Sequence, residues 1–130
     1  FDLSAATSGL DDPAYISAAG HLQNLARTGI DTAIDELKLD AIVAPTGSPA
    51  TKLDLVNGNH HKGGSSTLSA VAGYPILSLP AGYSFGMPIG ISFLGRAWSE
   101  ATLLRLGHAF ELATNLRQPP QYLPGSVIPD

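Results

Sequence analysis

The stretch that decides the fold reads Ala72-Gly73-Tyr74-Pro75-Ile76-Leu77-Ser78-Leu79-Pro80-Ala81-Gly82, followed after a short turn by Met87-Pro88-Ile89-Gly90-Ile91-Ser92-Phe93-Leu94-Gly95-Arg96. Each run is short, largely apolar and bounded by glycine and proline, a pattern that is typical of buried strands. Glycine and proline supply the turn geometries and end the hydrogen-bond ladder between strands. The stretch therefore predicts two buried strands joined by a tight connection.

A helix is expected to begin at Asp12-Pro13, because the aspartate accepts a hydrogen bond from a free amide of the first turn and the proline needs no donor there. Thr28-Gly29 is the point at which this helix could kink or split in two. Residues 40–45 predict a short buried strand that ends at Pro45. The apolar positions with helical spacing are Ile16, Ala19, Leu22, Leu25 or Ala26, Ile30, Ala33, Ile34 and Leu37.

The remaining elements follow from punctuation in the sequence. Residues 46–62 predict a long loop, and residues 65–72 a short helix that is capped by one of its serines and closed by Gly73. Ser99 is expected to cap a final helix that buries one face. That face consists of Leu103, Leu106, Gly107, Phe110 and Ala113. The order of elements predicts an α/β fold with a mixed β-sheet flanked by helices.

Length and composition limit the possible functions. The chain has 130 residues, 44% of them hydrophobic and only 14% charged, so it suits one modest domain with apolar surface that further protein could cover. The net charge of −4 and the seven scattered lysines and arginines argue against nucleic-acid binding. No apolar run approaches the roughly 20 residues that cross a membrane. Without cysteine, the chain has no disulfides and no thiol nucleophile.

The two quoted runs, with Ser99-Glu100 opening a helix after them, resemble the C-terminal part of the amidase signature hydrolases, and most closely the peptide amidase branch. The resemblance implies that residues 1–130 are the C-terminal portion of an amidase domain. Such an enzyme hydrolyses a carboxamide to acid and ammonia through a serine acyl-enzyme and needs no cofactor. Its partners would be the upstream part of the same polypeptide and a small amide or peptide amide. The chain begins at Phe1, which also favours a fragment.

The motif Lys62-Gly63-Gly64-Ser65-Ser66 invites a catalytic interpretation, because the resembling family uses a lysine and two serines. In that family the serine motif continues with glycines, whereas here Thr67-Leu68 follows. The family's serines also lie far upstream of the strand that begins near Tyr74. We therefore interpret the motif as a loop and a helix cap, and expect the catalytic Lys-Ser-Ser set to lie outside this chain, which alone should be inactive. The alternative function is a non-catalytic binding or structural module.

The loop before the first quoted run holds the best candidates for substrate contact. The resemblance implies that this stretch approaches the substrate funnel, so Asn57, His60 and His61 are expected to line the pocket. A metal site at the two histidines is the weaker alternative. Adjacent side chains on an extended loop point in opposite directions, and no third ligand accompanies them. We therefore expect no metal.

Three further side chains carry two interpretations each. Tyr74 and Trp98 could form an apolar wall around a substrate, although packing in the core or at its edge is the more frequent role of such aromatics. Arg96 could recognise a carboxylate or a carbonyl. The simpler expectation for Arg96 is a surface ion pair with Glu100.

Overall fold

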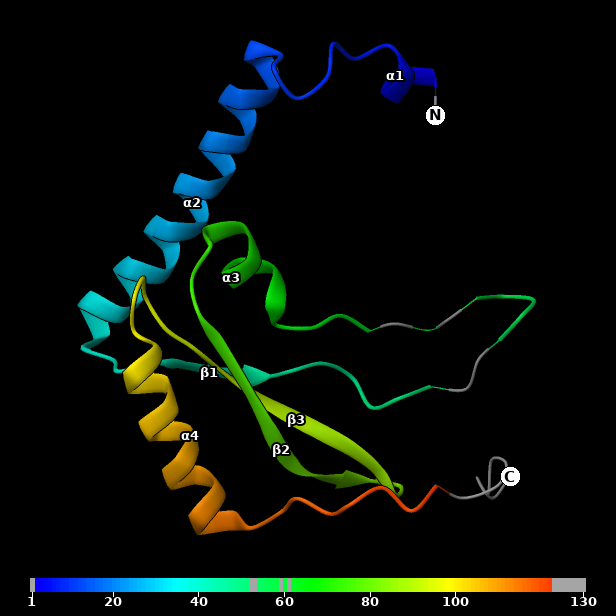
Figure 1. The fold of residues 1–130 in the computed structure, drawn as a ribbon, viewed down its shortest axis with the longest axis vertical. Helices are drawn as coiled ribbons and strands as arrows, with labels where there is room; N and C mark the ends of the chain where they lie inside the picture. The colour runs from blue at the N-terminus through cyan, green and yellow to red at the C-terminus, as the bar shows by residue number, and fades with distance from the viewer. Residues whose placement is uncertain (1, 52–53, 59, 61, 123–130) are drawn as a thin grey trace.

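The computed structural model describes residues 2–51, 54–58, 60 and 62–122. The elements in chain order are α1 (Asp2–Ala5), α2 (Pro13–Leu37), β1 (Ile42–Pro45), α3 (Ser66–Ala72), β2 (Ile76–Ser84), β3 (Met87–Leu94) and α4 (Glu100–Thr114). Both quoted runs are therefore confirmed as strands. Phe85 and Gly86 join them, both with positive φ (51° and 77°), which is the backbone twist that suits a tight hairpin. Figure 1 shows this hairpin projecting beyond β1.

The three described strands form one sheet in the order β1-β3-β2. β3 is the middle strand and pairs antiparallel with both neighbours. The α/β class with helices flanking a sheet is confirmed. The expected mixture of parallel and antiparallel pairs is wrong for these strands, because a hairpin joins β2 to β3 and the chain crosses over to place β1 on the other edge of β3.

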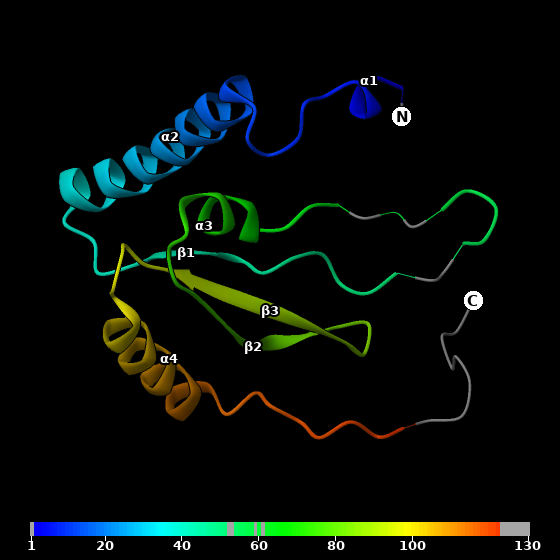
Figure 2. The ribbon, with the colours of Figure 1, turned by 45° about the horizontal axis from the view of Figure 1, so that its top comes forward.

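Helices cover both faces of the sheet (Figure 2). On one face, α2 and α3 pack against each other above the strands. Ile30, Ile34 and Ala72 are almost completely buried there, and Ile42 of β1 packs against them. Burial of these aliphatic side chains is the main favourable term that holds the two helices to the sheet.

The opposite face of the sheet is covered by α4, which packs on β2 and β3. Gly107 lets the helix approach closely, since a Cβ atom at this position would lie 2.5 Å from a methyl group of Leu77. Phe93 and Phe110 meet edge to face, with ring centroids 5.8 Å apart. Leu103 is only 2% exposed and is the most deeply buried leucine described on this helix.

Helix α2 begins as predicted, but its apolar side chains are buried along only part of its length. The Asp12 carboxylate accepts a hydrogen bond of 2.8 Å from the backbone N–H of Ala14, and Pro13 is the first helical residue. The helix runs through Thr28-Gly29 as one element, because a glycine in a helix costs only about 1 kcal/mol relative to alanine. In the second half, Ala26, Ile30 and Ile34 of the predicted apolar stripe are buried, whereas Leu37 is 68% exposed. The first half of the stripe is exposed, at Ile16, Leu22 and Leu25.

The two serine caps differ from expectation. Ser65 and Ser99 occupy the N-cap positions of α3 and α4, yet neither side chain makes a capping hydrogen bond. Both have ψ near zero, whereas a capping serine needs extended backbone to aim its hydroxyl at the first turn. The Ser99 hydroxyl instead donates to the carbonyl of Arg96 at 2.8 Å. Gly73 closes α3 in the left-handed conformation, as predicted.

Burial along α4 generates a stability prediction. Leu103→Ala should lower the free energy of unfolding by about 2–5 kcal/mol, because it leaves a cavity between the helix and the sheet. Leu104→Ala, at a neighbouring position that is 61% exposed, should change it by less than about 0.5 kcal/mol. Urea denaturation of both variants measures the difference. Equal losses would show that α4 does not pack on the sheet through Leu103.

Candidate functional site

An open pocket of about 400 Å³ lies where β1 ends and the following loop returns to α3. Its lining residues are Ala44, Pro45, Gly47, Ser48, Lys62, Gly63, Gly64 and Ser65. A backbone bridge between Gly47 and Gly64 holds the two ends of the loop together. The N–H of Ser65 donates to the carbonyl of Thr46 at 3.2 Å and ties the start of α3 to the end of β1. Residues far apart in the sequence therefore form one edge of this pocket.

A network of three hydroxyl groups lies behind this pocket. The Oγ atom of Ser92, whose residue is fully buried, lies 2.8 Å from Oγ1 of Thr46 and 2.9 Å from Oγ of Ser78. The N–H of Thr46 donates to the carbonyl of Gly90 at 2.8 Å. A Cβ atom at Gly90 would lie 2.7 Å from Oγ1 of Thr46, so only glycine leaves room for this side chain. The network links β2 and β3 to Thr46, the residue that follows β1, and fixes Thr46 between the pocket-lining residues Pro45 and Gly47.

The Lys62–Ser66 segment does not assemble a nucleophile and its base. Within the part of the chain that the structure describes, no hydrogen bond joins Lys62 to Ser65 or Ser66. The Ser65 hydroxyl is buried and has no partner among the described residues, while Ser66 is exposed on the first turn of α3. An activated serine needs a base within hydrogen-bond reach. The geometry thus favours the interpretation of the motif as loop and helix start.

The predicted pocket residues lie on the exposed loop between β1 and α3. Asn57 and His60 are both exposed and do not line the pocket beside β1, and His61 lies outside the described residues. Asn57 has a defined structural contact, because its backbone N–H and its side-chain amide donate to the two oxygens of Asp54 at 2.9 and 3.0 Å. Their contact with substrate stays a prediction.

Asp54 organises this turn as a hydrogen-bond acceptor. The backbone N–H of Asn57, its side-chain amide and the N–H of Val56 together lower the pKa of Asp54 below its usual value. The carboxylate therefore remains ionised at neutral pH and holds the turn from Asp54 to Gly58. Among the described residues, no group of three His, Cys, Asp or Glu side chains could hold a metal ion.

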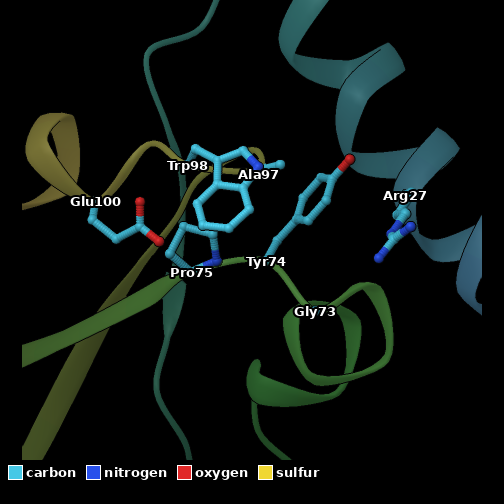
Figure 3. Close-up of a pocket in the computed structure, with 7 residues that line it drawn as sticks. All are labelled: Arg27, Gly73, Tyr74, Pro75, Ala97, Trp98 and Glu100. Carbon is cyan, nitrogen blue, oxygen red and sulfur yellow. The ribbon is translucent and has the colours of Figure 1, made fainter.

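A second pocket, of about 250 Å³, lies at the opposite end of β3 (Figure 3). Tyr74 and Trp98 both line it, so the structure brings the two predicted aromatics together. The Tyr74 hydroxyl donates to Asp31 at 2.7 Å, which raises the pKa of the phenol. Tyr74 is thus held against α2, whereas Trp98 is 91% exposed and has a positive φ of 62°. Exposure and left-handed backbone make Trp98 an unusual residue on this surface.

Two arginines brace the same end of the sheet. Arg27 donates from Nε to the carbonyl of Ala72 at 2.8 Å and lies over the Tyr74 ring, 5.9 Å from its centroid. Arg96 pairs with Asp35 at 2.6 Å, and this hydrogen bond raises its pKa further. The expected pair with Glu100 is wrong, because the side chain of Arg96 turns toward α2 and not toward α4. Both partners are largely exposed, so the pair adds little stability.

The hydroxyl network was not predicted from the sequence. The signal was present in single polar residues within apolar strands, at Ser78 and Ser92, and in Thr46 directly after a strand. Only the register shows that these positions meet, since Ser78 and Ala44 both pair with Ser92. No described helix is both long enough and apolar enough to cross a membrane.

Comparisons with known proteins give a consistent result. The family model described as Amidase matches residues 4–104. A probable amidase of Arabidopsis thaliana is 40% identical over 124 residues, which cover 95% of this chain and 21% of the plant protein. One subunit of the glutamyl-tRNA(Gln) amidotransferase of Desulforudis audaxviator is 33% identical over 132 residues, covering 95% of this chain and 26% of its own length.

Solved structures agree with the sequence matches. The native peptide amidase from Stenotrophomonas maltophilia is similar with a TM-score of 0.80 and 42% identity, over 92% of this chain and 24% of that enzyme. A peptide amidase in complex with the competitive inhibitor chymostatin gives a TM-score of 0.84 and 43% identity, over 90% of this chain and 24% of the other. The chain thus spans about a quarter of the length of the proteins it matches.

The hydroxyl network generates a prediction for Thr46. Thr46→Val removes the hydroxyl that meets Ser92 and preserves the shape of the side chain, so it should lower the free energy of unfolding by about 0.5–1.5 kcal/mol. Thr46→Ser keeps the hydroxyl and serves as the control. Chemical denaturation compares the two variants. A larger loss in Thr46→Ser than in Thr46→Val would mean that the methyl group and not the hydroxyl stabilises this corner.

The Asp54 turn generates a pH prediction. Folding lowers the pKa of Asp54, so the ionised carboxylate contributes to the stability of the folded chain. This contribution is fully present above the pKa that Asp54 has in the unfolded chain, and it is lost as the pH falls through the pKa of the folded chain. Asn57→Ala removes the side-chain donor and should raise the pKa of Asp54 toward its usual value. Val56→Ala keeps the backbone donor and should leave it unchanged. A carboxyl NMR titration measures both, and an unmoved pKa in Asn57→Ala contradicts the assignment.

Proposed function

Because the chain belongs to the amidase family, we propose that residues 1–130 are the C-terminal portion of an amidase domain. The complete enzyme hydrolyses the C–N bond of a carboxamide. The observation that carries this proposal is the match of residues 4–104 to the family model, together with the close structural similarity to peptide amidases at 42–43% identity. The similarity extends over nine-tenths of this chain. The simplest explanation is that this chain has the same fold as the matching part of those enzymes and the same role within the enzyme.

The proposed reaction is acyl transfer to serine and then to water. The serine oxygen forms a bond to the carboxamide carbon and gives up its proton, the C–N bond breaks, and the nitrogen takes up this proton and leaves as ammonia. Water then breaks the ester, returns the serine and releases the acid. The lysine and the two serines that perform these steps lie upstream of this chain. Support for this location comes from the Lys62–Ser66 segment, which does not bring a base to its serines.

The substrate class favoured by the similar structures is a small amide or a peptide amide. We place Asn57, His60 and His61 on the wall of the substrate funnel, where they would contact the part of the substrate that does not react. In support, the loop that carries Asn57 and His60 leaves the sheet at Thr46 and returns at Ser65. The hydrogen bond from Ser65 to Thr46 fixes the two ends of this loop beside the pocket at β1. The imidazole of His60 is exposed, and so is Asn57, whose side-chain amide also donates to Asp54.

The polypeptide encoded by the complete gene should release ammonia from a peptide amide. Its intact mass under denaturing conditions should be several times the 13.5 kDa of this chain.

Asn57→Ala and His60→Ala should raise KM with little change in kcat, because they remove contacts made equally in the ground and transition states. Loss of kcat without a change in KM would contradict the wall assignment.

The serines of the Lys62–Ser66 segment provide a second test of the same enzyme. Ser65→Ala and Ser66→Ala should retain kcat within about tenfold, whereas loss of a catalytic nucleophile costs a factor of about 10⁶. Thr67→Ala, at the neighbouring exposed position, is the control for damage to α3. An inactive, folded Ser65→Ala or Ser66→Ala enzyme would overturn the placement of the catalytic set upstream.

A further inference from the structure

The turn from Asp54 to Gly58 contains a chemically reactive pair of residues. Asn57 is followed by glycine, whereas leucine or histidine follows the other asparagines of the chain, which are Asn24, Asn59 and Asn115. Glycine has no side chain to shield its backbone nitrogen, and it leaves the backbone free to rotate. The nitrogen of Gly58 therefore reaches the side-chain carbonyl carbon of Asn57 more easily than the nitrogen of a larger residue would.

The reaction open to this pair is the loss of ammonia from Asn57. The Gly58 nitrogen gives up its proton and forms a bond to Cγ of Asn57. The bond between Cγ and the side-chain nitrogen breaks, and that nitrogen takes up the proton and leaves as ammonia. Water then opens the cyclic succinimide at either of its carbonyl groups, which leaves aspartate or isoaspartate at position 57. Water is the co-reactant, so the step needs no cofactor.

Asp54 holds both reacting groups in the folded chain. Its backbone carbonyl accepts the N–H of Gly58 at 3.0 Å, so the attacking nitrogen is engaged. Its carboxylate accepts the side-chain amide of Asn57 at 3.0 Å, so the leaving nitrogen is engaged as well. The same carboxylate also accepts the backbone N–H of Asn57 at 2.9 Å. Attack of the Gly58 nitrogen on Asn57 therefore requires these hydrogen bonds to open.

Hydrogen bonds, and not apolar packing, hold this turn closed. Leu55 is 98% exposed and Val56 is 90% exposed, so neither side chain is buried against the fold. Asn57 and Gly58 are exposed as well. A segment with few buried apolar contacts opens at a low cost in free energy and without unfolding of the core. The turn is thus able to open while the strands and helices remain folded.

We propose that Asn57 is a modification site, at which the folded protein converts asparagine to aspartate and isoaspartate, and that Asp54 slows this conversion by binding the Asn57 amide and the Gly58 N–H. The product does not restore the turn. A carboxylate at position 57 would face that of Asp54 where a hydrogen bond now joins the two side chains, and like charges at such a separation repel. Isoaspartate also lengthens the backbone. The modification therefore opens this loop permanently and adds a negative charge to it.

Peptide mapping by mass spectrometry of the complete polypeptide, kept folded at neutral pH, tests the proposal. Asn57 should convert faster than Asn24 and Asn115, which precede leucine. Its conversion should be slower in the folded protein than in guanidinium chloride, because the turn must open first. Absence of conversion at Asn57 in the folded protein overturns the proposal, and so do equal rates in the folded and the unfolded protein.

A pair of variants isolates the contribution of Asp54. Asp54→Ala should raise the rate of conversion in the folded protein at least about fivefold, because the hydrogen bonds to a charged acceptor are lost. In guanidinium chloride the same variant should convert at the wild-type rate. Leu103→Ala weakens the packing of α4 but keeps the hydrogen bonds of Asp54, so it should leave the rate within about twofold.

Two results of this comparison contradict the proposal. An unchanged rate in folded Asp54→Ala would show that Asp54 does not restrain the pair. Equal increases in Asp54→Ala and Leu103→Ala would show that conversion proceeds through global unfolding and not through the turn. Asn57→Gln controls for the chemistry, because glutamine would have to close a larger ring and should persist. Conversion of this glutamine at the rate of asparagine contradicts the cyclic route.

The outcome for Asn57 is separable from the outcome for the activity, because the modification involves only this turn and water. A protein that converts Asn57 but releases no ammonia from a peptide amide retains this inference and loses the proposed function. An active protein in which Asn57 persists does the reverse.

Discussion

The pairing of β3 on both of its edges is the constraint on which the rest of the structure depends. Its last three residues, Ser92, Phe93 and Leu94, are all buried, and each serves a different neighbour. Ser92 holds the hydroxyl network on one face, and Phe93 meets α4 on the other. Leu94 is paired with Ile42, which packs against α2. A shift of β3 by one residue would exchange the two faces and break all of these contacts.

The same strand separates two surfaces of different character. Near Gly90, Thr46 and the returning loop form a pocket whose walls are mostly backbone and small side chains. Beyond Leu94, the chain turns at Trp98 into α4 and forms the aromatic pocket with Tyr74 (Figure 3). At the first pocket, the hydrogen bond between the hydroxyl groups of Ser92 and Thr46 fixes the residue that follows β1. In the second, Asp31 and Arg27 fix Tyr74, whereas no hydrogen bond among the described residues holds the Trp98 ring.

The outer surface of the described chain carries many exposed apolar side chains. Helix α2 buries its apolar stripe only from Ala26 to Ile34, and Ile16, Leu22 and Leu25 are more than half exposed. Val43 of β1 is 51% exposed and belongs to the same pattern. An apolar helix face of this kind is typical of a surface that contacts other protein, which agrees with a chain that covers about a quarter of its relatives.

The sequence by itself determined the local structure of this protein. Asp12-Pro13, the two apolar runs and the Gly73 cap specified a helix start, two strands and a helix end through contacts within a few residues, and the paired runs also indicated the family. The tertiary structure decided what depends on distant partners. It turned Arg96 to Asp35, left the serine caps unused, joined Thr46 to Ser78 and Ser92, and exposed Val43. These features arise from strand register and helix packing, which bring together residues that no local pattern in the sequence connects.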